Sequence, residues 1–139
     1  MTDRVSSEQR SRMMAAVRGT DTMPELYVRR QLFAAGFRFR LHAKALPGKP
    51  DIVLPRFRIA VFVHGCFWHG HSCARGRRPA TNVQFWQAKI DGNIRRDRKN
   101  RADLKAAGWS VVVVWQCRLE SATQAVHERL KQLSAAQTE

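Results

Sequence analysis

The sequence lacks any apolar run that approaches the roughly 20 residues of a membrane span, and its polar first residues carry no signal-peptide pattern. These absences predict a cytoplasmic protein with no membrane partner. Repeats and low-complexity linkers are also absent, and 139 residues suffice to bury one hydrophobic core but not two. We therefore expect a single domain over residues 1–139.

Acidic residues are scarce, because 11 Asp and Glu stand against 25 Lys and Arg and give a net charge of +14. This balance is unlike that of an ordinary metabolic enzyme and indicates a polyanionic partner, most simply nucleic acid. Half of the surplus lies between Arg75 and Lys105, where ten basic residues accompany three acidic ones. Charge alone does not separate a nuclease from a ribosomal or non-specific DNA-coating protein.

Cysteine is rare as well, and three cysteines in a reducing compartment argue against a disulfide framework. Cys66, His71 and Cys73 share one loop, while Cys117 follows a distant apolar run. Three thiols and one imidazole form a ligand set that tetrahedral structural zinc prefers. His69 is a competing imidazole ligand, and buried inert thiols are the alternative to a metal site.

Capping signals and hydrophobic periodicity predict the secondary structure. Helices are expected over 6–18, 22–35 and 121–133, and a further helix begins at Thr81 or Asn82, is interrupted by Gly92 and resumes over 93–107. Strands are expected over 37–41, 51–54, 58–64 and 109–115. This order predicts an α/β fold with a mixed sheet flanked by helices. The first three strands would form a meander, and the fourth would return after the helical crossover.

Several side chains with catalytic chemistry gather around the predicted hairpin. Asp51 begins one strand, where a carboxylate can anchor magnesium, and His64 ends the next strand, so that the two would lie close together. His69 follows shortly after, and histidine can take a proton from an attacking water. Asp97 could orient that histidine, or it could instead pair with Arg101 on a solvated helix face.

Aromatic and sulfur-containing side chains offer a second kind of contact with DNA. The consecutive rings of Phe67 and Trp68 are unusual for a core and, with Trp86, could stack on bases, although plain burial also suits Trp86. Met13 and Met14 lie in the first expected helix, where core packing is the default role and a wedge against DNA the alternative.

A set of short strings spread along the chain is characteristic of one family. They are Pro50-Asp51, the run from Phe62 to His69, His71, Cys73, Pro79-Ala80-Thr81, Phe85-Trp86, Lys89-Ile90, Asn93, Arg96-Asp97 and Gly108-Trp109. With these strings, the chain resembles the very short patch repair (Vsr) mismatch endonucleases over nearly its whole length. The resemblance implies a restriction-endonuclease-like fold and nicking of one DNA strand 5′ to the thymine of a T·G mismatch left by deamination of 5-methylcytosine.

Carried over position by position, the resemblance also implies roles for individual residues. The implied ligands of a catalytic magnesium ion are Asp51 and the backbone carbonyl of Val63. Water would be activated by His69 with Asp97, while Glu25, otherwise a helix-cap residue, and His64 would hold metal-bound waters or the phosphate. The implied structural zinc ligands are Cys66, His71, Cys73 and Cys117. The implied intercalating residues are Phe67, Trp68, Trp86 and Met14, the last of these in a DNA-contacting helix within residues 1–20.

The chain departs from the family pattern in places. Val63 stands where the best-known members have threonine, a change that a backbone ligand tolerates, and the segment 70–78 is distinctive. We expect a monomer associated with the nucleoid, with mismatch-repair and methyltransferase proteins as candidate partners. The alternative from another class is a zinc-stabilised module that binds mismatched DNA without cutting it, and a generic structure-specific nuclease is a third reading.

Overall fold

The computed structural model describes residues 22–138, so the expected first helix, with Met13 and Met14, lies outside the described residues. The helices and strands keep the predicted order: α2 (Met23–Ala34), β1 (Arg40–Leu41), β2 (Ile52–Leu54), β3 (Ile59–His64), α3 (Val83–Ala106), β4 (Ser110–Trp115) and α4 (Leu119–Thr138). Short 3-10 turns over Pro55–Phe57, Ala74–Gly76 and Gln116–Arg118 join some of them. In the described range, no helix combines the length and apolar character that crossing a membrane requires.

The first described helix, α2, begins and ends at the predicted signals. Thr22 has extended backbone angles, and its Oγ1 accepts a hydrogen bond from the backbone N–H of Glu25 at 3.4 Å, as expected of an N-cap. Beyond the last turn, Gly36 adopts a φ of +94°, a conformation that glycine reaches without a steric penalty. The buried side of α2 carries Val28 and Leu32 together with Glu25.

The first three strands form the predicted antiparallel meander, which fixes the surroundings of Asp51. Ile52 pairs with Val61, and Leu54 pairs with Ile59. The strand expected over 37–41 is shorter than predicted, because only Arg40 and Leu41 pair with β2. In the described part of the chain before Arg40 there are no strand pairs, and Phe37 and Phe39 pack as loop against the core.

The fourth strand returns to the sheet after the helical crossover, as the sequence predicts, and its neighbour is the third strand. β4 pairs with β3 in parallel, from Ile59 opposite Ser110 to His64 opposite Trp115, and the sheet order is β1-β2-β3-β4. As an edge strand, β4 is mostly half-buried rather than fully buried as expected, and only Val114 is fully enclosed. Because the two strands end side by side, the loop after His64 meets the turn that carries Cys117.

Helix α3 is continuous, so the expected interruption at Gly92 is wrong. A glycine within a helix costs about 1 kcal/mol relative to alanine, which a long helix of good helix formers can tolerate. The helix begins after Asn82, whose side chain makes no capping hydrogen bond. It ends before Gly108, as predicted, where φ is +91°. The last helix, α4, is longer than expected at both ends, and Ser121 lies inside it rather than capping it.

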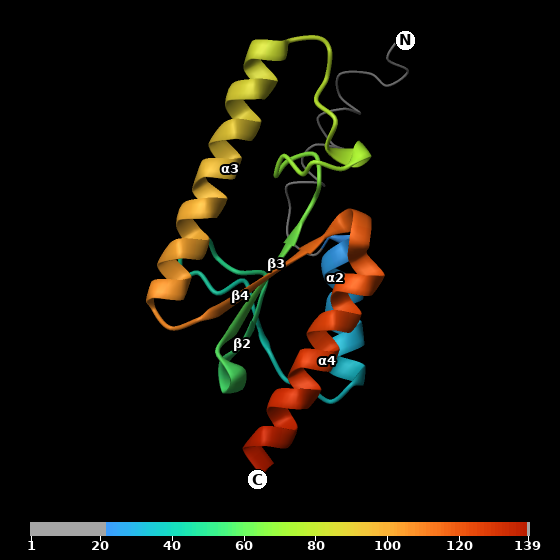
Figure 1. The fold of residues 1–139 in the computed structure, drawn as a ribbon, viewed down its shortest axis with the longest axis vertical. Helices are drawn as coiled ribbons and strands as arrows, with labels where there is room; N and C mark the ends of the chain where they lie inside the picture. Colours follow the sequence, from blue (N-terminus) through green and yellow to red (C-terminus); the bar gives the residue numbers. More distant parts are fainter. Residues whose placement is uncertain (1–21, 139) are drawn as a thin grey trace.

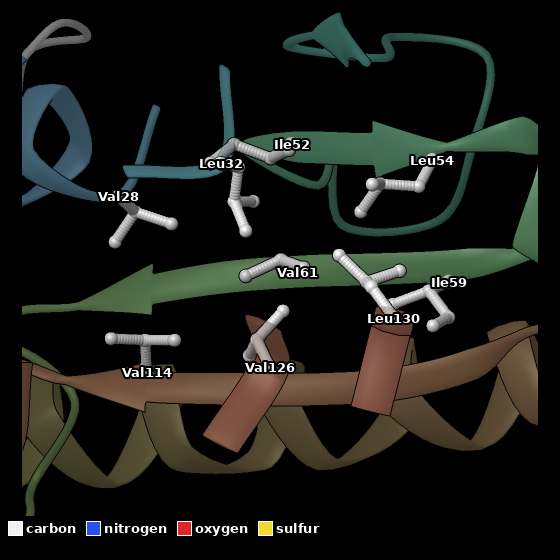
Figure 2. Packing of buried hydrophobic residues seen from close by; sticks show 9 residues of the cluster. All are labelled: Val28, Leu32, Ile52, Leu54, Ile59, Val61, Val114, Val126 and Leu130. Atoms are coloured by element: carbon white, nitrogen blue, oxygen red, sulfur yellow. The ribbon is translucent and has the colours of Figure 1, made fainter. Parts of the chain in front are cut away.

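The sheet is covered on both faces (Figure 1), with α2 and α4 side by side against one face and α3 against the other. The larger cluster, on the α2 and α4 face, contains Val28, Leu32, Ile52, Leu54, Ile59, Val61, Val114, Val126 and Leu130 (Figure 2). On the α3 face, Ala60 and Phe62 pack with Leu104. Alternate residues of β3 therefore point to opposite layers, which explains its nearly continuous apolar sequence.

Candidate functional site

The four predicted zinc ligands converge although 51 positions separate the first from the last in the sequence. One potential ligand atom from each of Cys66, His71, Cys73 and Cys117 lies within 4.8 Å of the others. The Cys117 Sγ lies 3.5 Å from the His71 Nδ1. Zinc bonds of about 2.3 Å to sulfur and about 2.0 Å to nitrogen, at a tetrahedral angle, place two such atoms about 3.5 Å apart. The donor set and its spacing therefore fit a tetrahedral metal ion.

The loop that carries these ligands is tightly closed. The backbone N–H of His71 donates to the carbonyl of Cys66 at 3.0 Å. A Cβ on Gly76 would lie 1.9 Å from the His71 carbonyl oxygen, so no larger residue fits there without a shift of the backbone. The His71 ring stacks on Trp115, with ring centroids 4.2 Å apart. The imidazole is thus held against the end of β4, beside the turn that supplies Cys117.

The thiols of this cluster differ in their acidity. Burial raises the pKa of Cys66 to about 11, partly opposed by a hydrogen bond to the Cys117 backbone. Burial also pushes the pKa of Cys73 upward, but hydrogen bonds with His71 and Cys66 outweigh it and lower that pKa to about 6. A metal ion binds the thiolate form, so Cys73 provides a charged ligand at neutral pH before any metal arrives.

His69, the competing zinc ligand, lies in a different group. Its Nδ1 is 2.6 Å from the Oδ2 of Asp97, in the middle of α3. Of the two arrangements considered for Asp97, the structure thus contains the pair with a histidine. Both side chains are partly accessible, at 27% for His69 and 18% for Asp97. The carboxylate therefore fixes which imidazole nitrogen carries the proton, while solvent or substrate can still reach the ring.

His64 belongs to the same group and is more deeply buried. Its ring stacks on that of His69, with centroids 3.7 Å apart and planes nearly parallel. Burial, followed by repulsion from His69, lowers the pKa of His64 to about 3, so it is neutral at physiological pH. Its buried Nδ1 finds no hydrogen-bond partner among the residues that the structure describes.

Asp51 lies in a third group, with Glu25 and His42, whose ligand atoms are all within 4.8 Å of one another. The backbone N–H of Val63 donates to the Asp51 Oδ2 at 2.7 Å. Burial raises the pKa of Asp51 to about 6, the Val63 hydrogen bond opposes this rise, and the nearby charge of Glu25 adds to it. Two carboxylates in a buried place favour a cation nearby.

His42 is a further residue of this group, and its local sequence carries no signal for a metal site. Its Nε2 lies 3.2 Å from the Glu25 Oε2, and its backbone N–H donates to the Asp51 carbonyl. The signal that could have found it is register: antiparallel pairing of Leu41 with Ile52 places the next residue opposite Asp51. A histidine directly opposite a proposed metal ligand is a candidate for the same site.

One cleft of about 940 Å³ is lined by residues of both the His69 group and the Asp51 group. Its walls include Glu25, Asp51, Val63, His64, His69 and Asp97. Three cations, Lys49, Lys89 and Arg96, line the same cleft and can contact phosphate oxygens. Asp51 and His64, predicted to be neighbours across the hairpin, thus face one space that can admit a polyanionic chain.

The aromatic residues form a cluster beside this cleft rather than part of the core. The Phe67 ring is 5.1 Å from Trp68 and 5.3 Å from Trp86, measured between centroids, and all three side chains are half-buried. The carbonyl of Trp68, a residue that also lines the cleft, accepts a hydrogen bond from the Asn93 side chain at 2.8 Å. Phe85 extends the cluster and is 58% exposed. Met14, the remaining predicted intercalating residue, lies outside the described residues.

Comparison with known proteins identifies the family of this chain. The model of the family described as DNA mismatch endonuclease Vsr matches residues 2–75. The chain belongs to the Vsr family. It is 38% identical to the DNA mismatch endonuclease Vsr of Escherichia coli over 130 residues, which covers 94% of this chain and 83% of the relative. This Vsr-family membership supports a nuclease, and therefore a hydrolase, that acts on DNA.

Two further relatives of this Vsr-family chain are described as nicking enzymes. The type II nicking enzyme V.XorIIP of Xanthomonas oryzae pv. oryzae is 50% identical over 133 residues, with 96% of this chain and 97% of the relative covered. The type II nicking enzyme V.NmeAIP of Neisseria meningitidis is 45% identical, with 96% and 94% covered. Each alignment spans nearly the whole of both chains.

Proposed function

We propose that the chain is a DNA repair endonuclease that nicks one strand 5′ to the thymine of a T·G mismatch arising from deamination of 5-methylcytosine. Phosphodiester hydrolysis would depend on magnesium. The observation that carries the proposal is the single cleft in which the His69–Asp97 pair and the Asp51 carboxylate face the same space. These are the two components that the hydrolysis needs, a base for water and an anchor for a cation.

In this mechanism, His69 is the general base. The Nδ1–H of His69 donates a hydrogen bond to Asp97 and stays on the ring. The Nε2 of His69 can then take a proton from water as the water oxygen forms a bond to phosphorus. One phosphoester P–O bond breaks, and the leaving oxygen takes up a proton. Asp51 and the backbone carbonyl of Val63 would hold the magnesium ion, which would supply positive charge near the phosphate. Glu25 and His64 border the same space and would hold its waters or the phosphate.

The proposed zinc site serves positioning rather than catalysis, because Cys66, His71, Cys73 and Cys117 would fill all four coordination positions. Both Trp68 and His69 lie between two of these ligands in the sequence. A metal that holds Cys66 and His71 to the end of β4 thereby also limits the movement of Trp68 and His69. Structural zinc would contribute to folding and hold the catalytic histidine in position.

Recognition of the mismatch would combine general phosphate contacts with local opening of the duplex. Lys49, Lys89 and Arg96 contact the backbone of any DNA, whereas the rings of Phe67, Trp68 and Trp86 would enter beside the weakly stacked T·G pair. The proposal includes a helix within residues 1–20 that contacts DNA and places Met14 beside the same step.

At the level of the whole molecule, we propose a single domain over residues 1–139 with a restriction-endonuclease-like core. The mixed four-stranded sheet, with helices on both faces, supports this assignment. A monomer suits an asymmetric mismatch, in which one strand must be cut. A nucleoid-associated location and contacts with mismatch-repair and methyltransferase proteins belong to the same proposal.

The proposal is tested with a duplex that carries one T·G pair in a methylated-cytosine context and a matched duplex of the same sequence. Each strand carries its own label, and the products are separated under denaturing conditions. We expect one nick, 5′ to the mismatched thymine, with magnesium and none without it. Cleavage of both strands, or equal cleavage of the matched duplex, contradicts the proposed specificity.

A zinc-stabilised module that binds mismatched DNA without cutting it shares the charge, the cysteine group and the aromatic cluster. The His69–Asp97 pair favours the enzyme, because neither binding nor structural zinc requires a histidine oriented by a carboxylate at the cleft wall. If the purified protein binds the T·G duplex selectively but leaves it intact with magnesium, the binding module is the correct reading.

A further inference from the structure

The group around Asp51 contains a nitrogen donor that the proposed mechanism does not use. Glu25 comes from the first turn of α2, His42 from the turn after β1, and Asp51 from the residue before β2. One ligand atom from each of the three lies within 4.8 Å of the other two. A cation bonded to both carboxylates would therefore lie within reach of the His42 Nε2.

The backbone holds His42 in this place at a conformational cost. Its φ is +46°, in the left-handed region that non-glycine residues seldom adopt. The His42 N–H donates to the Asp51 carbonyl, and the Ala43 N–H donates to the Pro50 carbonyl, both at 3.2 Å. These two hydrogen bonds fix the turn to the segment that leads into Asp51. Unusual backbone angles of this kind often occur at functional sites, where the surrounding structure imposes them.

A positive group already lies between the carboxylate and the imidazole. The Arg29 Nη2 is 3.0 Å from the Glu25 Oε2 and 3.2 Å from the His42 Nε2. The same His42 Nε2 is also 3.2 Å from the Glu25 Oε2, so it either donates to that carboxylate or presents a lone pair to the guanidinium, which only donates hydrogen bonds. The same lone pair is the one that binds a metal ion. Arg29 therefore occupies the place of a cation between an oxygen donor and a nitrogen donor.

We propose that His42 is a direct nitrogen ligand of the divalent cation at Asp51, that Glu25 then bonds this cation directly rather than through a water, and that the Arg29 guanidinium is displaced when the cation binds. The inference rests on the proposed function, which places a cation at Asp51. Magnesium prefers oxygen ligands, whereas imidazole suits transition metals. The donor set of two carboxylates and one imidazole accordingly favours Mn²⁺ over Mg²⁺ more strongly than carboxylates alone would.

The test uses Mn²⁺ as a spectroscopic probe. The full-length protein is first supplied with one equivalent of Zn²⁺ to fill the cysteine group, and Mn²⁺ is then added below one equivalent. Electron spin echo modulation detects a nitrogen bonded to Mn²⁺, and protein labelled with ¹⁵N only at histidine identifies the residue type. We expect a histidine nitrogen signal in the wild type that disappears in His42→Gln. The matched control, His127→Gln, should keep the signal, because His127 lies in α4, outside the cleft, where its ring packs against Phe37.

Affinity provides a second readout. In His42→Gln, the affinity for Mn²⁺ should fall about 10-fold or more, while the affinity for Mg²⁺ should change less than about 3-fold. If Mn²⁺ binds in an Asp51-dependent manner without a histidine nitrogen signal, His42 only forms hydrogen bonds with Glu25. That result overturns the inference and leaves the proposed function intact. If the wild type binds no Mn²⁺ that Asp51→Ala abolishes, the inference and the proposed cation site fail together.

Discussion

The Nδ1 of His69 and the Oδ2 of Asp97 are 2.6 Å apart, and this contact joins the loop after β3 to the middle of α3. The two residues are 28 positions apart in the sequence. The contact gives α3 a second role besides covering the sheet, because one of its carboxylates fixes the orientation of a cleft histidine. Short contacts between an imidazole and a carboxylate favour one proton position on the ring.

Asp97→Asn should therefore lower the single-turnover nicking rate about 100-fold or more while leaving affinity for the T·G duplex nearly unchanged. The amide retains the shape of the side chain but no longer stabilises a protonated His69. Asp103→Asn is the matched control, since Asp103 is on the same helix and pairs with Lys99 at the surface. Equal rates for the two variants would leave the His69–Asp97 contact without a catalytic role.

Trp68→Ala should weaken binding to a T·G duplex much more than binding to its matched counterpart. Each base stacked on an aromatic ring contributes about 1–3 kcal/mol, and opening a mismatched step costs less than opening a matched one. The salt dependence should hardly change, because it reports on phosphate contacts made by cations. Fluorescence titrations of both duplexes at several salt concentrations measure this, with Phe33→Ala, an exposed ring on α2, as the control. An equal loss for both duplexes means that Trp68 only packs the loop.

The purified protein should contain about one zinc ion, and Cys117→Ala should lower both the zinc content and the melting temperature. Cys117 is the only one of the four ligands that lies after β4, so its loss disconnects the loop from the sheet. Elemental analysis and thermal unfolding provide the two measurements. Native protein without zinc would identify the three cysteines as buried or half-buried thiols.

Asp51→Asn should stabilise the folded protein at pH 8 when magnesium is absent. Burial raises the pKa of Asp51 from 3.8 to about 6, so the folded state resists ionisation of this carboxyl group. The resulting destabilisation is absent below pH 3.8, grows between pH 3.8 and 6, and is complete above pH 6. The variant should therefore gain about 1–3 kcal/mol in free energy of unfolding at pH 8 and almost nothing near pH 4.

Urea titrations at the two pH values test this expectation. Added magnesium should stabilise the wild type and not Asp51→Asn, because a ligand that binds only the folded state raises its stability. A variant that is less stable than the wild type at pH 8 would show that the hydrogen bond from Val63 to Asp51 matters more than the burial of charge.

Much of the fold follows from local patterns in the sequence. Thr22 and Gly36 bound α2, and the order of strands and helices predicts the meander and the return of a fourth strand after the helical crossover. Two predictions fail for reasons that lie beyond a local window. Gly92 does not interrupt α3, because its neighbours continue the helix. Strand β1 is shorter than predicted, and Phe37 and Phe39 before it pack as loop against the core.

In the candidate site, too, some features follow from the local sequence and others depend on contacts between distant residues. The convergence of the three cysteines and His71 could be predicted, because Cys117 follows a strand expected beside the cysteine loop. The partner of Asp97 could not be chosen from sequence, since an ion pair within the helix and a contact with His69 were equally compatible with its position. His42 could not be predicted, because its proximity to Asp51 depends on the pairing register of the two-residue strand β1.

The most direct measurement of the central claim is the single-turnover nicking rate of a T·G duplex by the wild type, Asp51→Ala and His69→Ala, each at saturating protein with magnesium. Binding of the same duplex is measured in parallel, since phosphate contacts are spread over many cations and should survive both substitutions. We predict a nick 5′ to the thymine by the wild type, no detectable nicking by either variant, and similar affinity for all three. A variant that nicks at close to the wild-type rate would contradict the assignment of catalysis to this cleft.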